Sequence, residues 1–275
     1  MSAGSGGFMP DSTDFVPPTD ELLYERRGSI AVLTFNRPQA RNAMTWAMYN
    51  GLHDACDHAD GDDRVRVLML RGAGDKAFVA GTDISQFRAF DTPQDALDYE
   101  RDGNRYTARL EAVRKPTIAV LRGYCVGGGA GIAMSCDIRV AAPDVRFGIP
   151  IARTLGNTLS MSSLARMVAL IGPSRTKEIL FTARFVEAEE GKAAGLFSEI
   201  VPAERLETRA FELAEQIAAN APLTIRSLKE SIRRLLAHDR IEDAEDLILM
   251  AYMSDDFKEG VSAFLEKRPA QWKGR

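Results

Sequence analysis

The amino-acid sequence predicts an α/β fold with largely parallel strands and a helical C-terminal region. Apolar, β-branched runs alternate with segments whose apolar residues recur every three or four positions, as strands joined by right-handed crossover helices require. The run Thr117-Ile-Ala-Val-Leu121 is apolar along its whole length, which is typical of a strand buried on both faces. Beyond Ser160 nearly every segment has helical periodicity, so the sheet is expected to precede the helices.

The expected elements follow the chain in order. Strands are predicted at residues 29–35, 65–70, 77–80, 117–121 and 198–201. The first helix begins after Thr45, a good N-cap residue, and extends to about Ala59. Further helices are predicted at 93–113, 132–136, 164–170, 174–181 and 187–194, from Pro222 onward and from Ser254 onward.

The last two predicted helices have strongly apolar faces. The helix from Pro222 has one face made of Leu228, Ile232, Leu235 and Leu236. The helix from Ser254 has one face made of Phe257, Val261, Phe264 and Leu265. Such a face covers a functional site, builds a subunit interface or packs on the protein's own core, and the pattern does not choose among these three.

Three regions are expected along the chain. Residues 1–18 combine Gly and Ser with three prolines and predict a flexible leader. A core of residues 19–200 and a helical region of residues 201–275 follow. No segment approaches the about 20 apolar residues of a membrane span, and the first residues lack the pattern of a secretory signal. We therefore expect no membrane partner and a cytoplasmic location.

The charge and the rarer residue types exclude several function classes. The 275 residues contain 35 Lys and Arg against 39 Asp and Glu, a net charge of −4, so nucleic acid is not an expected partner. Cys56, Cys125 and Cys136 share no close spacing and are predicted to be small buried residues. His53 and His58 are five positions apart, which places them on different faces of a helix, so no metal site is expected.

Two glycine-containing turns place peptide N–H groups where a negative charge could be bound. Val126-Gly-Gly-Gly-Ala-Gly131 lies between a predicted strand and a predicted helix. It fits neither the dinucleotide fingerprint nor the Walker loop, and the alternative is that the glycines let the helix pack closely on the sheet. The second turn, Gly81-Thr-Asp83, follows the strand at 77–80, and Asp83 is interpreted as a helix cap. Together the turns would offer two peptide donors to one carbonyl oxygen.

A set of short motifs extends in order over about residues 20–270. They are Asn36-Arg-Pro38, Asn42-Ala-Met44, Ala77 to Ile84, Lys115-Pro116, Gly123 to Gly129, Cys136-Asp-Ile138, Phe147-Gly148 and Phe257 to Arg268. In this combination the sequence resembles the crotonase superfamily, the enoyl-CoA hydratase/isomerase group. The resemblance implies a repeated ββα spiral with a helical C-terminal part, assembled as a homotrimer or homohexamer.

The resemblance also implies an activity and a site. The substrate would be an acyl-CoA thioester whose carbonyl oxygen is held by the N–H groups of Thr82 and Gly128, so that a thioester enolate is stabilised. Coenzyme A would arrive as part of the substrate, and no tightly bound cofactor is expected. The residues that would border the CoA are Arg37, Ala40, Ala80, Asp83, Ile84 and Ser85, while Phe264 and Lys267 would reach the ligand of a neighbouring subunit.

Two positions depart from the hydratase pattern of this family. Gly131 and Ile151 stand where hydratases carry their two glutamates. The related dehalogenases have an aspartate nucleophile in this loop, at about Asn157 or Thr158, and Asn157 is our candidate for orienting the substrate or a water. The alternatives are another crotonase reaction, by a hydrolase, decarboxylase or C–C lyase that uses the loop at 153–160, and a non-catalytic acyl-CoA-binding protein.

Overall fold

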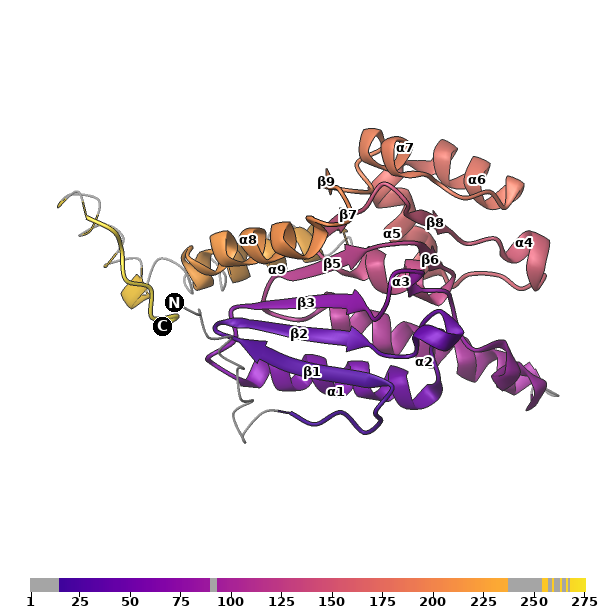
Figure 1. Ribbon diagram of the computed structural model, residues 1–275, viewed down its shortest axis with the longest axis horizontal. Coiled ribbons are helices and arrows are strands. Elements are labelled where there is room, and N and C mark those ends of the chain that lie inside the picture. The colour runs from indigo at the N-terminus through magenta and orange to yellow at the C-terminus, as the bar shows by residue number, and fades with distance from the viewer. Residues whose placement is uncertain are drawn as a thin grey trace, which may run out of the picture.

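The computed structural model describes residues 15–89, 93–236, 254–256, 259, 263, 266 and 268–275. Within this part of the chain a six-stranded sheet has the order β1-β2-β3-β5-β7-β9 and a three-stranded sheet has the order β4-β6-β8 (Figure 1). The strands are β1 (Leu22–Arg27), β2 (Ile30–Phe35), β3 (Val67–Gly72), β4 (Ala77–Val79), β5 (Thr117–Leu121), β6 (Tyr124–Val126), β7 (Ile138–Ala141), β8 (Arg146–Gly148) and β9 (Glu199–Ile200). Only β1 and β2 pair antiparallel among these strands, so the predicted parallel α/β architecture is confirmed.

The helices occupy most of the positions that the periodicity predicts. They are α1 (Trp46–Gly61), α2 (Pro93–Glu111), α3 (Gly128–Ser135), α4 (Ile151–Thr154), α5 (Met161–Ile171), α6 (Pro173–Thr182), α7 (Ala188–Ala193), α8 (Leu206–Ala218) and α9 (Pro222–Leu236), with short 3₁₀ turns η1 (Pro38–Ala40) and η2 (Ile84–Ala89). Thr45 caps α1 as predicted, since its hydroxyl accepts a hydrogen bond from the Met48 N–H. Helix α3 begins four residues earlier than expected, inside the glycine run.

Four strands of the structure were not predicted from the sequence. Strand β1 has the sequence LLYERR and lies at the edge of the sheet, so its polar residues hid it. Strands β6, β7 and β8 have only three or four residues each, too few for a periodicity to be recognised. Two of these short strands matter for the site, because β6 and β8 form the second sheet together with β4. Both glycine-containing turns extend from this sheet.

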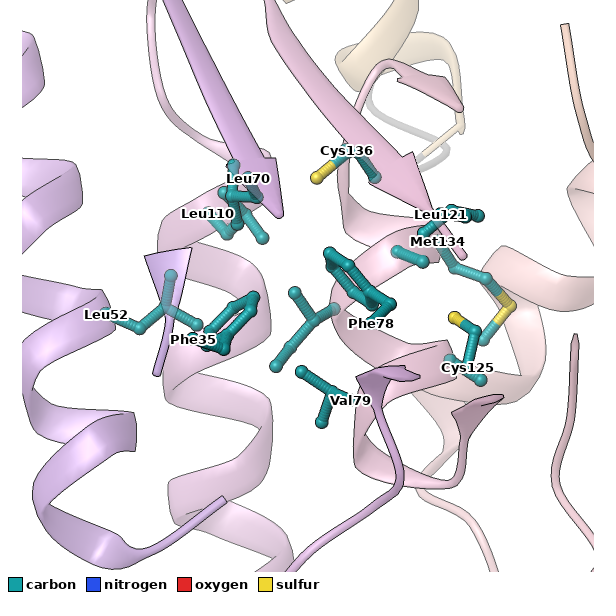
Figure 2. Packing of buried hydrophobic residues seen from close by; sticks show 14 of the residues in the cluster. Phe35, Leu52, Leu70, Phe78, Val79, Leu110, Leu121, Cys125, Met134 and Cys136 are labelled. Atoms are coloured by element: carbon teal, nitrogen blue, oxygen red, sulfur yellow. The ribbon is translucent and has the colours of Figure 1, made fainter. Parts of the chain in front are cut away.

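Alternate residues of the central strands face two different cores. Ile30 and Val32 of β2 pack with the apolar side of α8, whereas Leu33 and Phe35 face the core on the other side of the sheet. Figure 2 shows Phe35 in this larger core beside residues of α1, β3, β4 and α2. In Figure 1, α8 lies on one side of the sheet and α1 and α2 on the other. The strands are therefore buried on both faces, as the run at 117–121 predicts.

The three cysteines are buried and free, which confirms their prediction as packing residues. Burial raises the pKa of Cys136 to about 12, so its thiol stays protonated at neutral pH. Cys125 and Cys136 lie among the core side chains of Figure 2.

Both ends of the chain include predicted features outside the described residues. Residues 1–14 of the expected leader are among these, and Phe15 already packs its ring on His58 and Tyr24. The predicted helical face of Phe257, Val261, Phe264 and Leu265 is also outside the described part. In the residues that are described, no helix is long and apolar enough to cross a membrane.

The apolar face of α9 does not pack on the protein's own core. Leu228, Ile232, Leu235 and Leu236 are each more than half exposed. Of the three possibilities that the sequence left open for this face, packing on a core formed by the described residues is therefore excluded.

Helix α3 lies unusually close to strand β4. A Cβ atom on Gly129 would lie 2.1 Å from the Val79 carbonyl oxygen, far inside any real contact. The neighbouring Gly127 has a φ of 55°, a left-handed conformation that favours glycine. Close packing of the helix on the sheet is therefore one reason for the glycine run, as the sequence analysis allowed.

This contact predicts that Gly129→Ala destabilises the protein. The added methyl group must move backbone, at a cost of about 1–3 kcal/mol that exceeds the gain of about 1 kcal/mol in helix propensity. Thermal unfolding of Gly129→Ala and of Gly131→Ala measures this. The second variant is the matched control, because a Cβ on Gly131 meets only a Thr107 methyl group, at 3.9 Å. Equal melting temperatures for the two variants would contradict the packing argument.

Candidate active site

The two glycine-containing turns, α2 and the loop after β8 enclose a cavity of about 320 Å³. Its lining includes all three predicted catalytic residues, Thr82, Gly128 and Asn157, and two of the predicted CoA-bordering residues, Ala80 and Ile84. The other described lining residues are Tyr49, Gly81, Tyr99, Glu100, Gly103, Asn104, Thr107, Val126, Gly127, Gly131, Met134, Ile149, Pro150, Ile151, Thr154, Leu155, Thr158, Leu159, Ser160 and Ser163.

Thr82 and Gly128 lie against each other in the cavity wall. A Cβ on Gly128 would lie 3.3 Å from the Thr82 hydroxyl oxygen. Thr82 forms a parallel bridge with Met44, in which the hydrogen bonds use the Met44 and Asp83 N–H groups and not that of Thr82. Gly128 is the first residue of α3, where N–H groups have no partner inside the helix. The two residues that the resemblance assigns as peptide donors therefore lie side by side in the cavity wall.

A row of hydroxyl groups fixes the Thr82 side chain. The Thr82 hydroxyl oxygen lies 2.9 Å from the Tyr49 hydroxyl and 3.3 Å from the Tyr99 hydroxyl. The Tyr49 ring stacks on Tyr106 with a centroid distance of 5.2 Å. Burial raises the pKa of Tyr49 well above its usual range, so its phenol is neutral. Sequence reasoning missed both tyrosines that bind Thr82, because Tyr49 borders the apolar face of α1.

One face of α2 also lines the cavity. Glu100, Gly103, Asn104 and Thr107 follow the i, i+3, i+4, i+7 spacing that places side chains on one side of a helix. Burial raises the pKa of the Glu100 carboxyl, and the Ser160 backbone opposes this shift only in part. The sequence analysis treated 93–113 only as a crossover helix and missed these residues. The sequence did contain a signal for this face of the helix, because these small and polar residues recur at helical spacing.

The loop between β8 and α5 closes the other side of the cavity. Ile151 in this loop and Gly131 in α3 both line the cavity, so the two positions that the resemblance singles out face the same space. Asn157 lines it as an exposed residue. Ser160 caps α5, and its hydroxyl donates a hydrogen bond of 2.6 Å to the Asn104 side-chain oxygen. The loop is therefore tied to α2.

The remaining CoA-bordering candidates form a network beside the cavity. Arg37 pairs with Asp83 at 2.7 Å and with Glu21 at 3.0 Å. Asp83 accepts hydrogen bonds from the Ser85 hydroxyl and N–H, which confirms its interpretation as a cap. These bonds from Ser85 and Arg37 lower the pKa of Asp83.

The network stabilises the turn that carries Thr82, but its side chains do not line the cavity. Ala40 ends the short turn η1 and is half-buried outside the cavity lining. Phe264 and Lys267 lie outside the described residues.

Comparison with known proteins identifies the class to which this fold and cavity belong. Residues 25–275 match the family model described as enoyl-CoA hydratase/isomerase. The chain belongs to this family, which is the crotonase superfamily that the sequence motifs indicate.

Individual relatives are similar over nearly their whole length. The chain is 35% identical to the short-chain-enoyl-CoA hydratase of Clostridium acetobutylicum, over 90% of this chain and 96% of the relative. It is 34% identical to the crotonyl-CoA hydratase of Syntrophomonas wolfei, over 92% of this chain and 98% of the relative. The crystal structure of an enoyl-CoA hydratase/carnithine racemase from Magnetospirillum magneticum superimposes with a TM-score of 0.88 at 33% identity, covering 94% of this chain and 97% of that one. The expected crotonase-like fold is confirmed.

Proposed function

We propose that this protein acts on an acyl-CoA thioester and stabilises its enolate between the N–H groups of Thr82 and Gly128. The observation that carries the proposal is the contact between these two residues in the wall of one cavity. The relatives named as hydratases of short-chain enoyl-CoA and crotonyl-CoA support the substrate class.

Two fixed donors at a thioester oxygen have a direct chemical effect. When a proton leaves the carbon next to the carbonyl, negative charge develops on the oxygen, and donors already in position stabilise it without reorganisation. Removal of one such donor typically costs about 10²–10³ in rate. The site therefore favours reactions that pass through an enolate.

Hydration itself is the less favoured of these reactions in our proposal. Gly131 and Ile151 line the cavity and carry no group that activates water or delivers a proton. An alternative reaction would use the loop at 153–160, because Asn157 lines the cavity there. A non-catalytic acyl-CoA-binding protein is the remaining alternative, and it shares the same binding step.

We also propose a homotrimer or homohexamer, in which Phe264 and Lys267 of one subunit reach the ligand of the next. The exposed leucine and isoleucine side chains of α9 support a subunit contact. Sedimentation is expected to show a species of three or six times 30.2 kDa at micromolar concentration. A monomer under these conditions would contradict the assembly and leave the proposed chemistry untouched.

Binding of acyl-CoA is the first test of the proposed chemistry. Calorimetry with acetoacetyl-CoA should give a dissociation constant in the micromolar range, and Gly128→Ala should lose most of this affinity. The reason is that a Cβ at Gly128 would lie 2.3 Å from the Tyr49 hydroxyl, which forces the turn apart. Gly61→Ala is the control, since a Cβ there meets nothing within 4 Å. Absence of binding at millimolar ligand would refute the proposed function.

Crotonyl-CoA hydration is expected to be slower than in glutamate-bearing relatives by at least a factor of about 10²–10⁴, the usual contribution of one positioned acid or base. The decrease in enoyl-thioester absorbance measures the rate in the wild type, in Asn157→Ala and in Gly131→Glu combined with Ile151→Glu. Wild-type hydration as fast as in those relatives would show that an unassigned group activates water. Loss of the residual rate in Asn157→Ala would assign that group to the loop.

A further inference from the structure

Glu100 is the one carboxylic acid among the described residues that line the cavity. It extends from α2, whereas Gly131 and Ile151 belong to α3 and α4. Its neighbour Tyr99 lies 3.3 Å from the Thr82 side-chain hydroxyl, and Tyr99, Glu100, Thr82 and Gly128 all line the same cavity. A carboxyl group therefore shares the cavity with the two peptide donors, although neither position indicated by the resemblance supplies one.

The surroundings of Glu100 contain little charge. Tyr49 from α1 and Tyr99 from α2 are the other ionisable groups in the described lining, and the pKa of each is raised, so both are neutral. No described lining residue of α3 or of the loop at 151–160 is ionisable. Arg166 of α5 is paired with Glu111 at 2.8 Å.

Burial therefore dominates the titration of this carboxyl. It raises the pKa of Glu100 above the usual range, and the Ser160 backbone opposes this shift only in part. A carboxyl in this condition binds and releases a proton closer to neutral pH than an exposed one does, which is what a general acid–base catalyst requires.

We propose that Glu100 is the catalytic acid–base group of this cavity and transfers a proton to and from the carbon next to the thioester carbonyl. This inference rests on the proposed function, because it requires an acyl-CoA held by Thr82 and Gly128. It assigns the proton transfer to α2 and not to the loop that contains Asn157.

The proposed step is balanced without any further reactant. The Glu100 carboxylate removes a proton from the α carbon, and the electrons of that C–H bond form a double bond to the carbonyl carbon. The carbonyl π electrons move to the oxygen, where the two N–H groups bind the charge. The protonated Glu100 then returns its proton to the α carbon. In a β,γ-unsaturated acyl group it can instead deliver this proton to the γ carbon.

A single carboxyl favours some reactions over others. Hydration of an enoyl thioester needs one group to activate water and a source for the proton that reaches the α carbon. A proton shift needs only one group, which first accepts the proton and then donates it. The substrate class is therefore an acyl thioester with an acidic α C–H bond, and the favoured reaction is double-bond isomerisation.

The test must separate proton transfer from a structural role of the Glu100 side chain. Glu100→Gln does so, because the side-chain amide oxygen still accepts a hydrogen bond but the group carries no transferable proton. Asp102→Asn is the matched control: it removes a carboxylate from the same helix at an exposed position. The measurement is the exchange of the α protons of butyryl-CoA for deuterium in heavy water, followed by NMR, together with calorimetry of the same ligand.

We expect Glu100→Gln to slow exchange at least about 100-fold with the affinity for butyryl-CoA unchanged, and Asp102→Asn to behave as the wild type. A loss below tenfold in Glu100→Gln would overturn the inference and assign Glu100 a structural role. Wild-type binding without wild-type exchange would overturn it too, while leaving the proposed function intact. Absence of binding in the wild type would instead reject the proposed function.

The pH dependence of the wild type gives a second test that requires no variant. Exchange should increase with pH as Glu100 loses its proton and should level off, with a midpoint above the 4.5 of an ordinary glutamate. A midpoint in the range of a tyrosine, near pH 10 or higher, would move the role to Tyr49 or Tyr99 and overturn the assignment. A rate that is independent of pH between these limits would overturn it as well.

Discussion

The close approach of α3 to β4 is the constraint on which the cavity depends. Gly129 packs on the Val79 carbonyl at a distance that no side chain allows. The residue before it in α3 is Gly128, and the turn that leaves β4 contains Thr82. One packing contact therefore sets the distance between the two peptide groups that we propose to bind the substrate oxygen. Their geometry belongs to the buried core and does not depend on mobile side chains.

Polar contacts hold the start of β4, the strand that leads into the turn with Thr82. Asn42 is fully buried and has a φ of 57°, and its side-chain nitrogen donates to the carbonyl oxygens of Ala73 and Ala77 at 3.0 and 2.8 Å. Its side-chain oxygen accepts from the Arg37 N–H at 2.9 Å. A buried amide that satisfies three backbone groups is costly to replace, because any substitution leaves those groups unpaired. Strand β4, which leads to Thr82, is thus held by the close packing of Gly129 at one end and by the Asn42 hydrogen bonds at the other.

The sequence predicted the segments whose apolar residues recur at regular spacing and the segments that carry the family motifs. The strand at 117–121 was expected at its observed limits and the helix from Pro222 at its observed start, because their apolar patterns are regular. The contact between Thr82 and Gly128 was expected from their two turns. The acidic Glu100 was not found, since a polar residue on a crossover helix looks like a solvated one until the tertiary fold places it. Three-residue strands such as β8 could not be predicted for a related reason, because only their pairing with neighbouring strands identifies them as strands.

The structure can accommodate a side chain at Gly131 but not at Gly129, although the two are only two positions apart in the same short helix. The space beside Gly131 is open, with only the Thr107 methyl group at contact distance from an added carbon. A side chain can therefore be gained or lost there with little effect on how the protein folds. Evolution can change the reactive groups of such a cavity one substitution at a time while the frame that binds the thioester oxygen is inherited unchanged, so descendants of one ancestor can diverge in chemistry long before they diverge in shape.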